Sequence, residues 1–176
     1  MRSKGGMDLT VAAVVERQGQ FLMVEERIRG ALVLNQPAGH VEANESLIQA
    51  VIRETLEESA WRLTPADLLG LYLWRKPHSS RSYLRIAFTG TIDAHDPHRR
   101  LDRGIVRSLW MAREDMLMRA SELRSPLVLR CVDDYVRGQR YPLAAISDLT
   151  GDGDASCILQ GERLAAAAGN LLRTVN

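Results

Sequence analysis

Acidic side chains gather on one side of a helix predicted over residues 45–60. Glu54, Glu57 and Glu58 lie three and four residues apart, and Arg53 stands beside them. At 3.6 residues per turn, the three carboxylates fall within an arc of roughly 100°. Like charges at these spacings repel one another, so the helix is stable only where cations meet this face. The cluster therefore constrains both the fold and the chemistry of the chain.

Two interpretations of this acidic face are open. In the first, it is a solvated surface paired with arginines, which is the common case for an isolated acidic helix. In the second, it binds Mg²⁺, or Mn²⁺ in its place, because the single guanidinium of Arg53 cannot neutralise three acids. Mg²⁺ in proteins is held by a few carboxylates together with substrate phosphates. This interpretation predicts a diphosphate or triphosphate ester as the substrate.

The spacing of the charged residues extends beyond the helix. Gly39 is followed by Glu45, then by Arg53-Glu54, then by Glu57-Glu58. This string resembles the Nudix box, the signature of the Nudix hydrolase family. Ala60 stands where the family usually has Gly, and Thr55 where it usually has an aliphatic residue. If residue 60 ends the helix in the left-handed conformation, alanine there costs roughly 1 to 2 kcal/mol.

The resemblance implies roles for residues of the box. Glu54, Glu57 and Glu58 would hold Mg²⁺ together with the backbone carbonyl of Gly39, and Arg53 would orient the cluster by ion pairing. Glu54 is also the family's candidate base for the attacking water. Some members of the family use a base outside the box, for which this sequence offers Asp93, Asp96 and Asp102, with Asp102 preferred because it precedes a predicted strand.

Strings outside the box indicate a branch of the family. Residues 35–40, 123–127 and 138–143 resemble the bacterial NudJ-type phosphatases, and the likeness runs from residue 9 to residue 146. The resemblance implies release of phosphate from nucleoside di- and triphosphates, and from thiamine pyrophosphate or its pyrimidine pyrophosphate precursor. Two alternatives stay open. One is pyrophosphate-releasing cleavage of a nucleotide or of an ADP-ribose-type dinucleotide, and the other is a non-catalytic module that senses nucleotides.

Three residues outside the acidic face are candidates for binding the substrate. His40 adjoins Gly39 and could meet a phosphate, although a hydrogen-bonded loop histidine is an equal alternative. Trp74 and Arg85 lie on predicted strands, near Tyr83. Because strand side chains alternate between faces, packing into the core is an equal alternative for these residues.

The rest of the chain predicts an α/β fold, specifically an α/β/α sandwich with a mixed sheet, as the Nudix resemblance also implies. A hairpin is expected from residues 9–16 and 20–26, because Gln18-Gly19 is a turn signal between two apolar runs. Asn44 is expected to cap the box helix. Further strands are expected at residues 31–35, 68–74, 83–92 and 105–111, and further helices at 112–120 and 126–137.

The expected organisation is a short N-terminal extension (residues 1–8), one Nudix domain (9–146), and a C-terminal linker with a short helix (147–176). The net charge is +1, and the basic residues are scattered among the acids, so no nucleic-acid partner is expected. No apolar run is long enough for a membrane span, and two cysteines without zinc spacing fit a reducing compartment. We expect a cytoplasmic monomer or homodimer acting on a small pyrophosphate substrate.

Overall fold

Two β-sheets form the framework of the molecule. The computed structural model describes residues 6–149. The first sheet, here called the mixed sheet, has the strand order β5-β1-β7-β6-β9, in which β1 and β7 are parallel and the other neighbours are antiparallel. The second, the antiparallel sheet, is built around β3, which pairs with β2, β4 and β8.

The strands of the mixed sheet are β1 (Met7–Val14), β5 (Ala38–His40), β6 (Trp61–Arg75), β7 (Ser82–His95) and β9 (Tyr141–Pro142). Those of the antiparallel sheet are β2 (Glu16–Arg17), β3 (Gln20–Ile28), β4 (Ala31–Asn35) and β8 (Ile105–Ala112). The helices are α1 (Leu47–Ser59), α2 (Arg113–Met118) and α3 (Leu127–Val136), with 3-10 turns η1 (Ala120–Glu122) and η2 (Leu143–Ala145).

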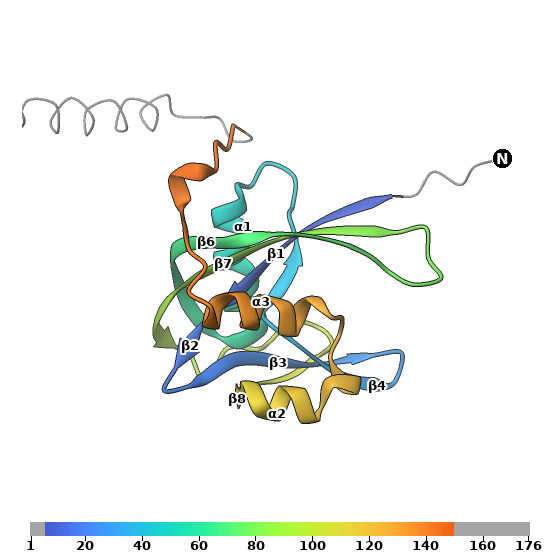
Figure 1. Ribbon diagram of the computed structural model, residues 1–176. Helices are drawn as coiled ribbons and strands as arrows, with labels where there is room; N and C mark the ends of the chain where they lie inside the picture. The colour runs from blue at the N-terminus through green and yellow to red at the C-terminus, as the bar shows by residue number, and fades with distance from the viewer. Residues whose placement is uncertain (1–5, 150–176) are drawn as a thin grey trace, which may run out of the picture.

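Helices cover both faces of the mixed sheet. Figure 1 shows α3 in front of its strands and α1 behind them. Alternate residues of β7 divide between the two sides, since Phe88 packs in one buried cluster with Val51 of α1, and Ala87 packs in another with Val128 of α3. The α3 cluster also contains Met23 of the antiparallel sheet. The predicted α/β sandwich with a mixed sheet is confirmed, and β3 of the second sheet contributes to both clusters, with Met23 in one and Leu22 in the other.

The expected hairpin of residues 9–16 and 20–26 was right in its turn and wrong in its extent. Gln18 and Gly19 both have positive φ, 56° and 79°, as a tight two-residue turn requires. Only β2 pairs with β3 across this turn. Strand β1 instead runs parallel to β7 in the other sheet. Local apolar alternation marks a strand but does not select its partner, because the choice depends on distant segments.

The box helix begins later than predicted. Ser46, not Asn44, is the N-cap, and its hydroxyl accepts a hydrogen bond from the N–H of Gln49, whose side chain accepts one from the N–H of Ser46 in return. Asn44 has a φ of 66° and lies in the preceding turn. At the other end, Ala60 has a φ of 59°, so the helix does end in the left-handed conformation at an alanine.

Most of the remaining elements follow the prediction, with shifted ends, although the short strands β5 and β9 were not predicted. Strand β6 begins at Trp61, directly after α1, and accommodates Pro65 where its register with β7 shifts. The expected β6–β7 hairpin, the strand at β8 and the helix at α3 are present, while α2 has only six residues. Most of the predicted C-terminal linker and its helix lie outside the described residues. No helix within residues 6–149 is long and apolar enough to cross a membrane.

Candidate active site

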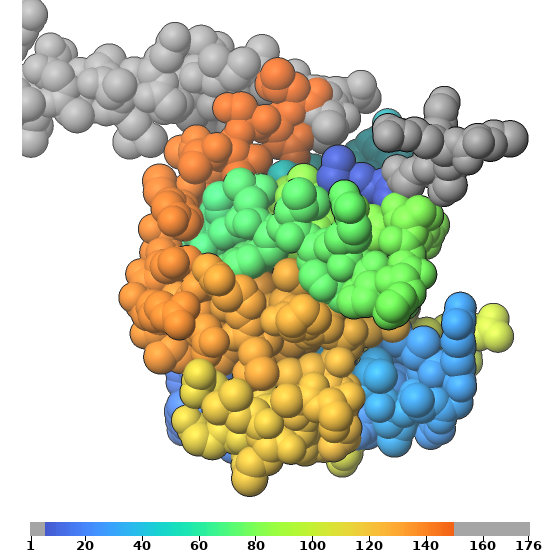
Figure 2. All heavy atoms as spheres, turned by 45° about the vertical axis from the view of Figure 1, so that its right-hand side comes forward, coloured from blue at the N-terminus to red at the C-terminus, as the bar shows by residue number. Residues whose placement is uncertain are grey.

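One cavity of about 440 Å³ collects the charged residues of the box and residues from distant parts of the chain. In Figure 2 the hairpin of β6 and β7 (green) lies above the segment with α2 and α3 (gold to orange), and the β3–β4 hairpin (blue) lies beside them. Acids line part of the cavity: Glu26, Glu42, Glu54, Glu57, Glu58 and Asp102. Basic and aromatic side chains line another part: Arg53, Trp74, Lys76, Tyr83, Arg85 and Arg124. The cavity thus combines cation-binding and anion-binding groups.

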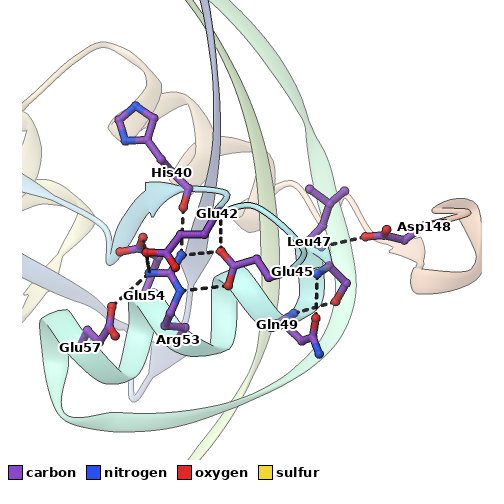
Figure 3. A network of polar contacts seen from close by, with 10 residues as sticks. His40, Glu42, Glu45, Leu47, Gln49, Arg53, Glu54, Glu57 and Asp148 are labelled. Atoms are coloured by element: carbon purple, nitrogen blue, oxygen red, sulfur yellow. Dashed lines mark hydrogen bonds and ion pairs between the residues drawn. The ribbon is translucent and has the colours of Figure 1, made fainter. Parts of the chain in front are cut away.

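Arg53 is the centre of the polar network on α1, as Figure 3 shows. Its Nη1 donates to Glu54 Oε1 at 2.8 Å and to Glu57 Oε2 at 3.1 Å. Its Nε and Nη2 donate to the two oxygens of Glu45 at 3.0 and 2.5 Å, and Nη2 also donates to the carbonyl of His40 at 3.0 Å. Because the acceptor Glu45 and the other carboxylates favour the charged form, the pKa of Arg53 is raised. The guanidinium joins α1 to the loop before it and to β5.

Glu54 packs against the backbone of Gly39. A Cβ atom at Gly39 would overlap the carboxyl group of Glu54. This explains why glycine is required at the start of the box: the absent side chain leaves room for the acid. Burial raises the pKa of Glu54, an effect that the hydrogen bond from Arg53 opposes.

Glu58 is a partly buried acid of the box. Its Oε2 accepts a hydrogen bond from the N–H of Ala38 at 2.8 Å. Burial, together with the nearby charges of Glu54, Glu26 and Asp102, raises the pKa of Glu58 to about 8, against the effect of that hydrogen bond. Several carboxylates from α1, β3 and the 96–104 loop therefore share a space with too little positive charge.

The donor set fits a hard divalent cation. As the side chains stand, no three acidic, histidine or cysteine residues in the described part of the chain converge on one point. Arg53 instead lies between Glu54 and Glu57 and donates to both. Crowded, partly buried carboxylates are nevertheless oxygen donors of the kind that a hard divalent cation takes, and a bound positive charge would relieve their repulsion.

Residues predicted to bind substrate lie around the same cavity. Trp74 packs against Tyr83 with ring centroids 5.7 Å apart, and both line the cavity wall. Arg85 also lines it and is buried. His40 is exposed at the edge strand β5, with Nε2 3.9 Å from Asp8 Oδ1, and it lines the cavity as well.

The three candidate bases outside the box differ in whether they line the cavity. Asp102 lines the cavity, and its backbone N–H donates to the carbonyl of Glu57 at 3.0 Å. Asp96 accepts a hydrogen bond from the N–H of His98 in its own loop, and neither it nor Asp93 lines the cavity. The backbone of Asp96 does contact the end of the box, through its N–H and the carbonyl of Ala60 at 3.0 Å, but of the three acids Asp102 alone lines the cavity.

Several residues of the cavity were missed as candidates in the sequence. Glu26 lies near Glu58, whose pKa it raises. Asn35 is uncharged, and its side-chain oxygen accepts a hydrogen bond from Arg85. Arg124 and Ser125 come from the segment before α3. Asn35, Arg124 and Ser125 lie within the strings that resemble NudJ-type phosphatases, which was the available signal. Glu26 carries no such signal, because it is one acid in an ordinary strand pattern.

Comparisons with known proteins agree with this geometry. A family model described as the NUDIX domain matches residues 7–131. The phosphatase NudJ of Escherichia coli (strain K12) is 41% identical over 140 residues, which cover 80% of this chain and 90% of that protein. A NUDIX hydrolase from Nitrosomonas europaea is 44% identical with a TM-score of 0.80, covering 83% of this chain and 99% of that one.

A MutT protein from Methanosarcina mazei Go1, with a TM-score of 0.62 and 22% identity over 79% of this chain and 100% of that one, shows the shared fold alone. The fold and the family match together define a hydrolase of the α/β sandwich class, in which the acids of α1 line an arginine-containing cavity. The chain belongs to the Nudix family.

Proposed function

We propose that the chain is a Mg²⁺-dependent phosphoanhydride hydrolase that releases orthophosphate. Its proposed substrates are nucleoside di- and triphosphates, and thiamine pyrophosphate or its pyrimidine pyrophosphate precursor. The observation that carries the proposal is that one cavity is lined both by the acids of α1 and by Trp74, Arg85 and Arg124. Its similarity to proteins named phosphatase NudJ supports orthophosphate as the product.

In this proposal Glu54, Glu57 and Glu58, with the carbonyl of Gly39, hold the cation. A bound divalent cation supplies charge neutralisation at the phosphate oxygens and lowers the pKa of an attacking water. Glu54 is the proposed base for that water, since burial raises its pKa and so favours acceptance of a proton. Asp102 is the second candidate for this role, because it lines the same cavity.

Arg53 has a positioning role in the proposed mechanism. Its hydrogen bonds to Glu45 and to the His40 carbonyl fix the guanidinium independently of the metal ligands. Arg53 would stay tied to the loop and to β5 with a cation bound at Glu54 and Glu57, so it limits how far these two acids can move. The ring of the substrate is assigned to Trp74 and Tyr83, whose tilted pair forms an aromatic wall.

A phosphate-release screen tests the proposal. The full chain is incubated with Mg²⁺ and each candidate substrate, orthophosphate is measured colorimetrically, and the nucleotide products are separated by chromatography. We expect orthophosphate from the wild type and a loss of at least about 100-fold in rate for Glu57→Gln, with an unchanged unfolding midpoint. Glu114→Gln, on exposed α2, is the matched control. A nucleoside monophosphate with pyrophosphate, and no orthophosphate, would show the pyrophosphate-releasing alternative to be correct.

A further inference from the structure

Arg85 carries a buried positive charge that forms no ion pair with the acids of residues 6–149. Its side chain is 6% exposed, and its Nη1 and Nη2 donate to the amide oxygens of Gln36 and Asn35 at 3.1 and 3.2 Å. Its Nε is buried without any hydrogen-bond acceptor. None of the ion pairs found within residues 6–149 includes Arg85. A charge buried among neutral partners is costly, so the site calls for an anion.

The surroundings of Arg85 do not supply that anion. Burial raises the pKa of the neighbouring Cys131 thiol to about 11, so the thiol is neutral at physiological pH. Burial lowers the pKa of Arg85, and the charge of Arg124 lowers it further, while Glu58 raises it. Two guanidinium groups therefore lie near each other, and the closest acid is already part of the crowded carboxylate group.

The segment before α3 adds donors to the same wall of the cavity. Ser125 is 8% exposed, and its Oγ is buried without a hydrogen-bond partner. Ser125 and Leu127 both line the cavity, so the N-terminus of the ten-residue helix α3 opens onto it. The N-terminal turn of a helix carries partial positive charge and free N–H groups. Arg124 is half-exposed beside it, with only a distant contact to Glu26 at 3.9 Å.

The strand register places Arg85 one step inward from the aromatic wall. Trp74 is paired with Tyr83 across β6 and β7, and Tyr72 with Arg85 is the next pair on the same face. A step of two residues along a strand is about 7 Å. Arg85 is also paired with Thr10 of β1, which is paired with His40 of the edge strand. Two strand spacings, about 10 Å between backbones, thus separate Arg85 from the strand against which Glu54 packs.

We propose that Arg85, Arg124, Ser125 and the first turn of α3 form a phosphate-binding subsite that holds the terminal phosphate of the substrate. The inference rests on the proposed function and deepens it by naming the residues that hold the phosphate to be released. The ring lies on Trp74 and Tyr83 near the mouth, and the phosphate farthest from the ring lies at the buried donors. The oxygen of water then bonds to the terminal phosphorus, and the bridging P–O bond breaks. The electron pair stays on the bridging oxygen, and the proton of the water passes to a carboxylate.

Binding of inorganic phosphate to the full chain in EDTA tests the subsite without catalysis. Isothermal titration calorimetry compares the wild type with Arg124→Gln and Ser125→Ala. Arg75→Gln is the matched control, because Arg75 is exposed, lies next to Trp74 in the sequence and does not line the cavity. Loss of a charge-assisted hydrogen bond should weaken phosphate binding about tenfold or more in Arg124→Gln, and about three- to tenfold in Ser125→Ala. The control should stay within about twofold of the wild type.

Two results overturn the subsite: a wild type that takes up no phosphate at roughly 10 mM, or equal affinity in all four proteins. The phosphate-release screen is independent of this outcome. If the wild type releases orthophosphate while Arg124→Gln and Ser125→Ala bind phosphate as tightly as the wild type does, the subsite is wrong and the proposed function stands. If both variants lose phosphate affinity and no substrate is hydrolysed, the phosphate site stands and the proposed function is wrong.

Discussion

Replacing Gly39 by alanine separates the position of Glu54 from the stability of the fold. The backbone of Gly39 does not have the left-handed φ that would strain an alanine. The new Cβ would, however, overlap the carboxyl group of Glu54, the end of a flexible side chain. The cheapest response is a rotation of Glu54 away from β5. We therefore expect a folded protein with a displaced acid.

The two magnitudes follow from that displacement. Moving Glu54 off its preferred rotamer costs of order 0.5–1.5 kcal/mol, so the free energy of unfolding should fall by about 1 kcal/mol. The carboxyl group must move by roughly 1 Å or more to reach normal contact distance, and a misplacement of that size in a catalytic site costs on the order of 100-fold in rate. The variant should therefore lose activity far out of proportion to its stability.

The assay pairs urea unfolding with Mg²⁺-dependent phosphate release. Gly6→Ala is the control, because a Cβ at Gly6 meets nothing within 4 Å. It should match the wild type in both measurements. A Gly39→Ala protein that keeps more than about a third of the wild-type rate would refute the reasoning, as would one whose loss of activity is explained by unfolding.

Three further predictions concern other parts of the structure. Arg53→Lys should lower the rate by about 10- to 100-fold at a similar unfolding midpoint, because a lysine cannot reproduce the paired bonds to Glu45; wild-type kinetics would exclude a positioning role. Ser46→Ala should cost about 1 kcal/mol in urea unfolding while Ser46→Thr costs little, and equal values for both would contradict the observed cap. Burial raises the pKa of the Cys131 thiol to about 11, so the thiol stays protonated below that pH. Iodoacetamide at pH 8 should therefore modify Cys131 at least about 100-fold more slowly in the folded chain than in urea. Peptide mass spectrometry measures the labelling, and rapid labelling of the folded chain would contradict the burial of Cys131.

The box itself was predictable because its residues lie within one short stretch of sequence. Helical periodicity places Glu54, Glu57 and Glu58 on one face, and that face does line the cavity. The left-handed end at Ala60 was also foreseeable, since the departure from glycine is visible in the sequence. The cap at Ser46 was not, because Asn44 is an equally good capping residue and the choice depends on how the preceding turn closes.

The rest of the site depends on pairings that local patterns do not encode. Arg85 meets Asn35 because β7 lies beside β1, and β1 lies beside β5, the strand that follows Asn35 in the chain. The parallel pairing of β1 and β7 joins segments more than 70 residues apart. Glu26 lies on β3, which the sequence predicted to pair with β1. It approaches Glu58 because β3 instead belongs to the second sheet, where it pairs with β8. A strand's alternation fixes two faces but leaves open which neighbour each face meets.

The uptake of Mg²⁺ by the full chain, measured by titration calorimetry, tests the central claim most directly. The acids of α1 should bind the ion in the wild type, and Glu57→Gln should weaken that binding by about tenfold or more, while Glu114→Gln leaves it unchanged. If the wild type takes up no Mg²⁺, or if all three proteins bind it equally, these carboxylates are not the metal ligands.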